Sequence, residues 1–280
     1  MKDGFIQLSV KSDQDGLRLD QLLATVISRR LAKKMIEQGA VFLNKSRCKI
    51  AGRHVHAGAK VSFPEKLPAP PPPIDAEDFI IGETEDFIAV NKPFLWPTAP
   101  TPFGDLYCVQ RAVEKSAGLK TTWIFQRLDY HTTGVLVFAK NSAALKTVEK
   151  YPTVKEYLAV VSAKGIKPQM INLPIAPDPL RKERYIVKKG GVDSVTEILT
   201  VDERETFSIL KLRLHTGRTH QIRVHLSHLG YGVMGDPWYG DVHKFEGCDL
   251  MMLHSFRYVI EAPEPVVFEA KPPKLWPEIS

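Results

Sequence analysis

The sequence predicts an α+β fold: a mixed, largely antiparallel β-sheet with flanking helices, preceded by a small α/β module. In the larger part of the chain, strand-like patterns follow one another through short turns more often than through helices, which favours an antiparallel sheet. Near the N-terminus, two amphipathic helical patterns precede two short strand patterns, and a proline-rich stretch separates them from the rest. These observations indicate two structural units joined by a linker.

The N-terminal module begins with helices. Leucine, valine and isoleucine at helical spacing predict a helix over residues 19–27. Ser28 is a suitable N-cap for a second helix that runs to Glu37 and is terminated at Gly39. Strands are predicted over Val41–Asn44 and Lys60–Phe63. The second helix has a basic face, which fits either phosphate binding or solvated charge; its cations are Arg29, Arg30, Lys33 and Lys34.

The linker is the stretch Leu67–Pro73, LPAPPPP. Proline has no backbone N–H to donate, so this stretch continues neither a helix nor an interior strand, and we expect extended polyproline geometry. We therefore assign residues 1–66 to the N-terminal domain, 67–75 to the linker and 76–280 to a second domain.

The second domain accounts for most of the predicted sheet. Strands are predicted at Ile80–Asn91, Thr122–Asp129, Val135–Ala139, Lys155–Ser162, Ser194–Thr200, Phe207–Leu214 and Tyr258–Glu261. Helices are predicted at Leu106–Ser116, Asn141–Lys150 and Thr219–Leu229.

One carboxylate stands out in the segment QRLDYHTTGVLVFAKN, residues 126–141. Asp129 lies between an arginine and a Thr/Gly turn that leads into an apolar strand. A carboxylate held in a fixed pose at the mouth of a hydrophobic strand can serve as a nucleophile or base. By itself, the pattern also fits a turn cap or a surface ion pair.

A second block, residues 215–240, contains a glycine turn, a short amphipathic helix and a Gly/Pro/Asp-rich loop. Thr219 is the expected N-cap of the helix and Gly230 its C-terminal cap. Arg218 and Arg223 lie at the start of this helix. At least one of these guanidinium groups is expected to be anchored beside buried surface and directed at an anion.

These motifs together support a resemblance. RLDYHTTG, KEYLAVV, TGRTHQIRVHL, GDPWYG and LHSFRY, in this order, resemble the motifs of the RluA-type pseudouridine synthases. The resemblance implies the pseudouridine synthase fold and an enzyme that isomerises uridine to pseudouridine in RNA with no cofactor and no metal. The N-terminal pattern RLDQLLA, GAVFLN and HAGAKVSF resembles the S4 RNA-binding domain, so its basic face is expected to contact RNA.

The resemblance also implies roles for individual residues. The nucleophilic aspartate falls on Asp129, the active-site tyrosine on Tyr157 and the aspartate-pairing arginine on Arg223. Tyr157 combines a flat face for uracil with a hydroxyl, although a strand tyrosine in the core has the same pattern. The target base has to be flipped out of its stack, and Arg127 is expected either to fill the vacated space or to bind phosphate. Substrate contacts are also expected from the helix start, at Arg218, His220 and Gln221.

The chain departs from the family pattern at three places. Gln126 stands where a histidine is common, and Thr133 replaces a serine. The glycine that normally follows Lys-Pro-x is absent after Lys92, which predicts a different course for the loop 94–104. None of these changes removes a proposed catalytic group.

Composition limits the remaining alternatives. The 280 residues carry a formal net charge of +6, which favours a polyanionic partner, and no apolar run is long enough to span a membrane. We expect a cytoplasmic monomer. Its RNA is expected to be large-subunit ribosomal RNA, or transfer RNA as the second choice. The three cysteines are too dispersed for a disulfide framework or a zinc site.

Two other functions fit parts of the sequence. An RNA-binding protein that has lost catalysis would lack Asp129, Tyr157 or Arg223, and all three are present. A metal-dependent nuclease could use clustered histidines as zinc ligands, but the pattern lacks an acidic partner at helical spacing. The histidines in question are His225 and His228 with His131 or His254.

Overall fold

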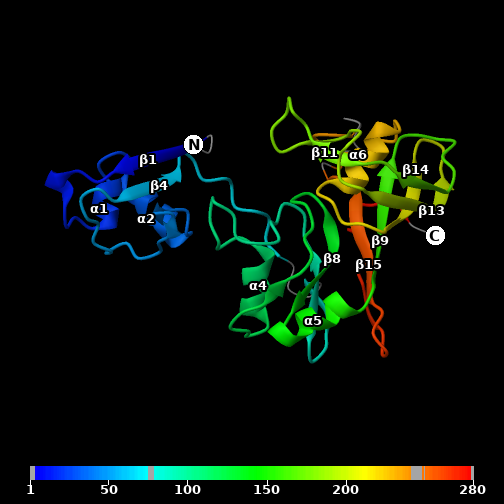
Figure 1. The fold of residues 1–280 in the computed structure, drawn as a ribbon, viewed down its shortest axis with the longest axis horizontal. Coiled ribbons are helices and arrows are strands. Elements are labelled where there is room, and N and C mark those ends of the chain that lie inside the picture. The colour runs from blue at the N-terminus through cyan, green and yellow to red at the C-terminus, as the bar shows by residue number, and fades with distance from the viewer. Residues whose placement is uncertain (1–3, 75–78, 241–247, 249, 279–280) are drawn as a thin grey trace. The chain divides into compact units, whose positions relative to one another are not determined.

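The computed structural model describes residues 4–74, 79–240, 248 and 250–278 (Figure 1). The chain forms two compact units. The first consists of the chain up to Pro72 together with Pro97–Gly118, and the second of Pro73–Trp96 with Leu119 onward. In the part of the chain that is described, no helix is long and apolar enough to cross a membrane.

The first unit is built on a small antiparallel sheet with strand order β1-β4-β2-β3. Two helices pack on it, and their apolar side chains, among them Leu19, Leu22, Met35 and Ile36, are fully buried with Phe63 of the sheet. The elements are β1 (Phe5–Ser9), the 3-10 helix η1 (Ser12–Gln14), α1 (Leu19–Leu23), α2 (Arg29–Glu37), β2 (Phe42–Leu43), β3 (Ser46–Arg47), β4 (Lys60–Pro64) and α4 (Val109–Ser116).

Helix α2 has the predicted bounds. The Ser28 hydroxyl accepts a hydrogen bond from the Leu31 amide at 3.3 Å, and Gly39 adopts a φ of 69° just beyond the C-cap. Helix α1 is shorter than predicted. It ends at Leu23 because Thr25 donates its hydroxyl back to the Leu22 carbonyl at 2.7 Å, and β-branched residues follow.

The segment Pro97–Gly118 groups with the first unit, although its sequence places it within the second domain. Asp105 explains this grouping: its carboxylate forms a 2.9 Å ion pair with Lys49, and its amide donates to the Gln38 carbonyl at 3.0 Å. Arg47 donates to the Thr101 carbonyl at 2.7 Å. Residues 97–104 of the loop that lacks the family glycine therefore contact the S4-like sheet and helix.

In the described residues, the second unit contains a mixed sheet of ten strands. Eight of them follow the order β10-β13-β14-β9-β15-β8-β6-β5, while β16 pairs with β15 and β7 pairs with β8. Neighbouring strands are antiparallel except for β8 and β15, so the predicted fold class is confirmed. The elements are β5 (Ile80–Glu83), β6 (Phe87–Lys92), β7 (Trp123–Ile124), β8 (Thr133–Ala139), α5 (Ser142–Lys150), β9 (Thr153–Val161), β10 (Gln169–Asn172), β11 (Ile175–Pro177), β12 (Tyr185–Val187), β13 (Val195–Glu203), β14 (Ser208–Leu214), α6 (Gln221–His228), β15 (Leu253–Ile260) and β16 (Val266–Glu269).

Two of the predicted strands are altered. The segment 80–91 is a hairpin rather than one strand, because the Thr84 hydroxyl accepts the Phe87 amide at 3.0 Å and turns the chain between β5 and β6. The segment 122–129 is a strand only at β7; the remainder is the loop that carries Asp129. Strands β10, β11, β12 and β16 were not predicted.

Strand β8 runs through the centre of the second unit, and every one of its residues is buried. It lies between β6 and β15 in the sheet and is covered by α5, whose predicted cap Asn141 accepts the Ala144 amide at 2.8 Å (Figure 1). This buried strand begins at Thr133, so it gives the preceding Asp129 loop a rigid base.

Candidate active site

Asp129 lies in a loop whose geometry is set by the residues that follow it. The Thr132 amide donates to the Asp129 carbonyl at 3.1 Å, and Thr133 and Gly134 then pair in parallel with His254 and Ser255 of β15. A Cβ on Gly134 would lie 2.2 Å from the Ser255 carbonyl oxygen, so only glycine fits. The turn leaves the side chain of Asp129 24% exposed, within reach of a substrate.

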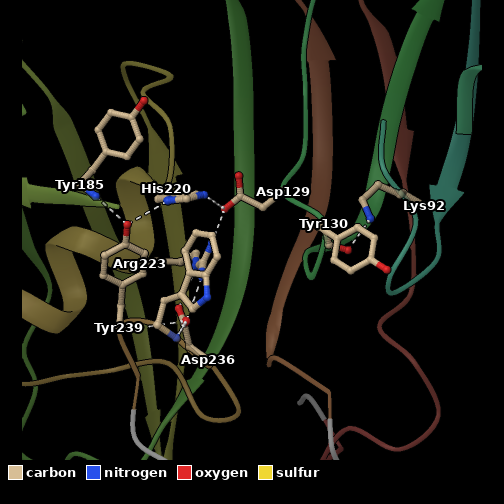
Figure 2. Close-up of polar contacts among 9 residues, drawn as sticks. Lys92, Asp129, Tyr130, Tyr185, His220, Arg223, Asp236 and Tyr239 are labelled. Atoms are coloured by element: carbon tan, nitrogen blue, oxygen red, sulfur yellow. Dashed lines mark hydrogen bonds and ion pairs between the residues drawn. The ribbon is translucent and has the colours of Figure 1, made fainter. Parts of the chain in front are cut away.

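Arg223 anchors Asp129 from helix α6. Its side chain is 2% exposed and lies between two carboxylates: Nη1 donates to Asp129 Oδ2 at 2.8 Å, while Nε and Nη2 donate to Asp236 at 2.7 and 2.9 Å (Figure 2). Burial alone lowers the pKa of Arg223, but the two carboxylates, Asp236 foremost, raise it above its usual value. The guanidinium therefore stays charged and fixed.

Asp236, in the motif GDPWYG, accepts hydrogen bonds from Nε and Nη2 of Arg223, the two guanidinium nitrogens that do not bond Asp129. It is buried, and its Oδ1 also accepts the amides of Trp238 and Tyr239 at 2.8 and 3.1 Å. Burial would raise the pKa of Asp236, but the Arg223 guanidinium lowers it below the usual range. Gly235 permits this loop, because it has a φ of 72° and a Cβ there would lie 2.3 Å from the Leu250 carbonyl oxygen. The sequence motifs did not predict this role for Asp236.

His220 lies on the other side of Asp129. It is the N-cap of α6, one residue later than the predicted cap Thr219, and it has left-handed backbone angles. Its Nε2 lies 3.8 Å from Asp129 Oδ2, and its Nδ1 lies 2.9 Å from the Tyr239 hydroxyl. Helix α6 ends as predicted, since Gly230 has a φ of 79° and the Tyr231 amide donates to the Leu226 carbonyl.

Tyr157 is buried on β9, opposite Ser255 of β15, and its hydroxyl hydrogen-bonds the Ser255 side chain. Burial raises the pKa of Tyr157, and the nearby charge of Asp129 raises it further, so the phenol remains protonated at neutral pH. Arg223 bonds Asp129 directly, and the charge of Asp129 acts on the Tyr157 phenol, so the structure brings the three residues into one region.

Lys92 is a site residue that sequence reasoning missed. It is fully buried at the end of β6, and its ammonium donates to the carbonyls of Pro93, Trp96 and Tyr130 at 2.9, 2.8 and 3.3 Å. Burial lowers the pKa of Lys92 to about 7, while the charge of Asp129 opposes this shift. Lys92 thus ties the chain after β6 to the residue that follows Asp129 (Figure 2).

The other predicted contact residues differ in their availability. Arg127 and Arg218 are exposed, as are the four cations of α2 in the first unit. Gln221 is a correction: it is buried, and its amide bonds Thr216, Arg218, Val195 and Thr196. This leaves it no free group for RNA, so it fastens the start of α6 to β13 instead.

The histidines are engaged in structural hydrogen bonds. Buried His225 bonds the Thr196 hydroxyl and the Leu173 carbonyl, both at 2.9 Å. His254, another histidine of the zinc alternative, is also buried and lies between the Thr133 hydroxyl and the Ala270 carbonyl. Among the described residues, no group of three or more His, Cys, Asp or Glu side chains could hold a metal ion.

A partly exposed carboxylate that is held by a buried guanidinium, with a protonated tyrosine nearby, is an arrangement that can act in nucleophilic or acid-base catalysis. A family model described as RNA pseudouridylate synthase matches residues 86–228, and an S4 domain model matches residues 17–61. The chain belongs to the RNA pseudouridylate synthase family, with an S4 domain near its N-terminus, and is an isomerase that acts on RNA.

Curated relatives agree with this assignment. An uncharacterized RNA pseudouridine synthase of Aquifex aeolicus (strain VF5) is 33% identical, over 83% of this chain and 80% of the relative. The ribosomal large subunit pseudouridine synthase D of Pasteurella multocida (strain Pm70) is 30% identical, over 84% and 76%. A solved structure, human RNA pseudouridylate synthase domain containing 1, aligns with a TM-score of 0.59 and 26% identity, over 72% of this chain and 86% of that one.

Proposed function

We propose that Asp129 is the group that breaks the glycosidic bond of the target uridine. The observation that carries this proposal is the unequal environment of its two oxygens. Oδ2 is held by Arg223 at 2.8 Å, whereas Oδ1 accepts no hydrogen bond from any described residue. A carboxylate anchored through one oxygen presents the other in a fixed direction, which suits nucleophilic attack or proton abstraction.

Two routes use this oxygen. In the first, Oδ1 bonds to C1′ as the bond from C1′ to uracil N1 breaks, which gives an ester and a uracil anion. In the second, Asp129 removes the proton on C2′, which gives a glycal and the same anion. After uracil turns, C5 bonds to C1′, and either the ester bond breaks or C2′ regains its proton. C5 then loses its proton and N1 takes one up.

Tyr157 and Arg127 complete the proposal. The C1′ and C5 atoms cannot be reached while the base is stacked, so the uridine has to be flipped into the pocket. Tyr157, beside Asp129, offers a ring for uracil and a hydroxyl that is protonated at neutral pH. Arg127 is exposed and two residues from Asp129, which supports a role either in filling the space that the base leaves or in binding phosphate.

We further propose that the substrate is large-subunit (23S) ribosomal RNA, with transfer RNA as the second choice. Relatives from several organisms carry the name ribosomal large subunit pseudouridine synthase D, which supports this choice. The exposed cations of α2 in the S4 unit supply a surface for phosphates. Asp129, Arg223 and Tyr157 come from one chain, which supports a monomer. As the family resemblance implies, we also propose that the enzyme is cytoplasmic and needs no metal or cofactor.

The test is conversion of uridine in EDTA. Protein is incubated with uridine-labelled cellular RNA, and pseudouridine is separated from uridine after digestion. We expect conversion by the wild type and by Asp13→Asn, an exposed control, and none by Asp129→Asn, whose RNA binding should be kept. Unchanged conversion by Asp129→Asn would refute the role of Asp129, and metal-dependent shortening of the RNA would favour a nuclease.

The RNA target is tested separately. Carbodiimide primer extension maps pseudouridines in RNA from cells with and without the gene. A stop that disappears only from large-subunit ribosomal RNA supports the first choice. A stop that disappears only from transfer RNA overturns it in favour of the second.

A further inference from the structure

We propose that His220 is a positioning residue for Asp129: its Nε2–H is a second donor to Oδ2, in a tautomer fixed by Tyr239 and the backbone of Tyr185. This inference rests on the proposed role of Asp129. It assigns to His220 a task other than the RNA contact expected from its place at the start of α6.

The imidazole ring of His220 is held on several sides. Three aromatic rings pack edge-on against it, with centroids of Tyr185, Trp238 and Tyr239 at 5.7, 5.3 and 5.5 Å. The backbone of His220 has φ 59° and ψ 17°, in the left-handed region, which histidine enters more readily than most residues that have a side chain. This backbone conformation and the three rings together fix the direction of the imidazole.

The tautomer of His220 follows from a chain of hydrogen bonds. The Tyr185 amide donates to the Tyr239 hydroxyl oxygen at 2.8 Å, and this oxygen lies 2.9 Å from His220 Nδ1 (Figure 2). Of the two groups that contact the hydroxyl among the described residues, the Tyr185 amide can only donate, so Nδ1 is the one that can accept the hydroxyl proton. Nδ1 is therefore the acceptor, and the proton of the neutral ring is on Nε2, the atom that faces Asp129.

The Nε2–H group faces the oxygen that Arg223 already holds. Nε2 lies 3.8 Å from Asp129 Oδ2, longer than a hydrogen bond, as is common for catalytic groups before the substrate binds. Closure around a nucleotide needs only a small rotation of the Asp129 side chain to complete the bond. Two donors on Oδ2 then direct Oδ1 at the sugar and stabilise the carboxylate when it leaves C1′.

The ring is neutral under ordinary conditions. Burial lowers the pKa of His220, and the guanidinium of Arg223 lowers it further, whereas Asp129, Asp236 and Glu183 oppose the shift. A neutral donor steadies Asp129 without neutralising its charge, which a nucleophile or base requires. In this proposal, the charge of Arg223 keeps Asp129 ionised, and the hydrogen bond from His220 helps to orient its carboxylate.

Two amide substitutions separate this role from a structural one. His220→Gln places a donor near the position of Nε2, whereas His220→Asn places one near Nδ1 and is better tolerated in a left-handed N-cap. Positioning through Nε2 predicts that Gln keeps kcat within about fivefold of the wild type, while Asn and Ala lose about 10- to 100-fold, the effect of one hydrogen bond to a charged acceptor. A purely structural cap predicts that Asn is the better of the two.

The experiment measures kcat at saturating RNA, RNA affinity and thermal unfolding for the three His220 variants and for Tyr239→Phe, which removes the hydroxyl that orients the ring. We expect Tyr239→Phe to lose kcat at least fivefold with RNA affinity unchanged. Asn as active as Gln, equal loss in all three variants, or wild-type kcat in Tyr239→Phe would overturn the inference. If the wild type makes no pseudouridine, the proposed function fails instead.

Discussion

The clearest test of the site architecture is Asp236→Asn. Asp236 is buried and accepts four hydrogen bonds: Oδ1 takes those from Arg223 Nη2, Trp238 and Tyr239, and Oδ2 takes the one from Arg223 Nε. An asparagine can keep its oxygen where the three donors converge. Its NH₂ group then faces Arg223 Nε–H, so a charge-assisted hydrogen bond is replaced by two opposed donors.

The size of the effect follows from these contacts. Removing one partner of a buried ion pair destabilises a protein by about 3–5 kcal/mol. Asp129 still balances part of the Arg223 charge, so we expect a loss near the lower end, about 3 kcal/mol. For a unit of this size, that loss lowers the Tm by about 6–12 °C. Activity should fall too, because Arg223 loses the contact that fixes its plane.

The assay combines urea and thermal unfolding with pseudouridine formation at a temperature where the variant is folded. The matched control is Glu269→Gln on β16. Glu269 forms a 2.9 Å ion pair with Arg257, and the two side chains are 54% and 34% exposed, respectively. Such a surface pair contributes under about 1 kcal/mol. If Asp236→Asn and Glu269→Gln change the free energy of unfolding by similar small amounts, Asp236 does not support Arg223 in the way described.

Further predictions concern pH, the loop after β6 and RNA affinity. Burial lowers the pKa of His254 in the folded protein to about 4, whereas in the unfolded chain it is about 6.5, so the unfolded chain binds more protons between these two pH values. The free energy of unfolding should therefore fall by about 3 kcal/mol in total as the pH drops through this window. Urea unfolding of His254→Gln should show a flatter pH dependence. Lys92→Met removes the donor that holds the carbonyls of Pro93, Trp96 and Tyr130, so hydrogen exchange at the amides of residues 94–96 should quicken and kcat should fall about tenfold. Unchanged exchange would contradict the anchoring role of Lys92. Replacing Arg30 and Lys34 with glutamine should weaken RNA binding and reduce its salt dependence by one to two phosphate contacts, with kcat at saturating RNA unchanged; an unaltered salt slope would remove α2 from the RNA surface.

The sequence predicted the central contact of the site but not all of its supports. Asp129 and Arg223 are 94 positions apart, and the motifs that contain them brought both into one hypothesis with Tyr157. Periodicity alone placed each of them near a turn or helix end. Their meeting depends on the pairing of β8 with β15, which no local pattern encodes.

The sequence did not predict Lys92 and Asp236 as site residues, and the reason is physical. A lysine at the end of a strand and an aspartate in a Gly/Pro turn are ordinary surface residues, and only the folded chain shows that both are buried. Gln221 was predicted to contact RNA, because a polar residue at the start of a helix is usually accessible. In the folded chain its amide instead donates to Val195 and Thr196 of β13. Short strands such as β11 and β16 lack a run long enough to show alternation.

Leu95 occupies the position at which the family pattern has a glycine. Leu95 has a φ of 62°, so the backbone takes the left-handed conformation that a glycine would favour, with Lys92 bonding the carbonyls on either side. A different course for this loop was predicted from the missing glycine. At Leu95 itself, the turn does not require glycine.

The measurement closest to the central claim is single-turnover conversion of labelled RNA by excess Asp129→Asn and Asp129→Glu, beside the wild type. Asparagine keeps the shape and an oxygen for Arg223 but has no nucleophilic or basic oxygen, and glutamate has the charge in a displaced position. We predict no pseudouridine from asparagine, a trace from glutamate, and RNA affinity equal to wild type for both. Conversion by Asp129→Asn at the wild-type rate would contradict the account.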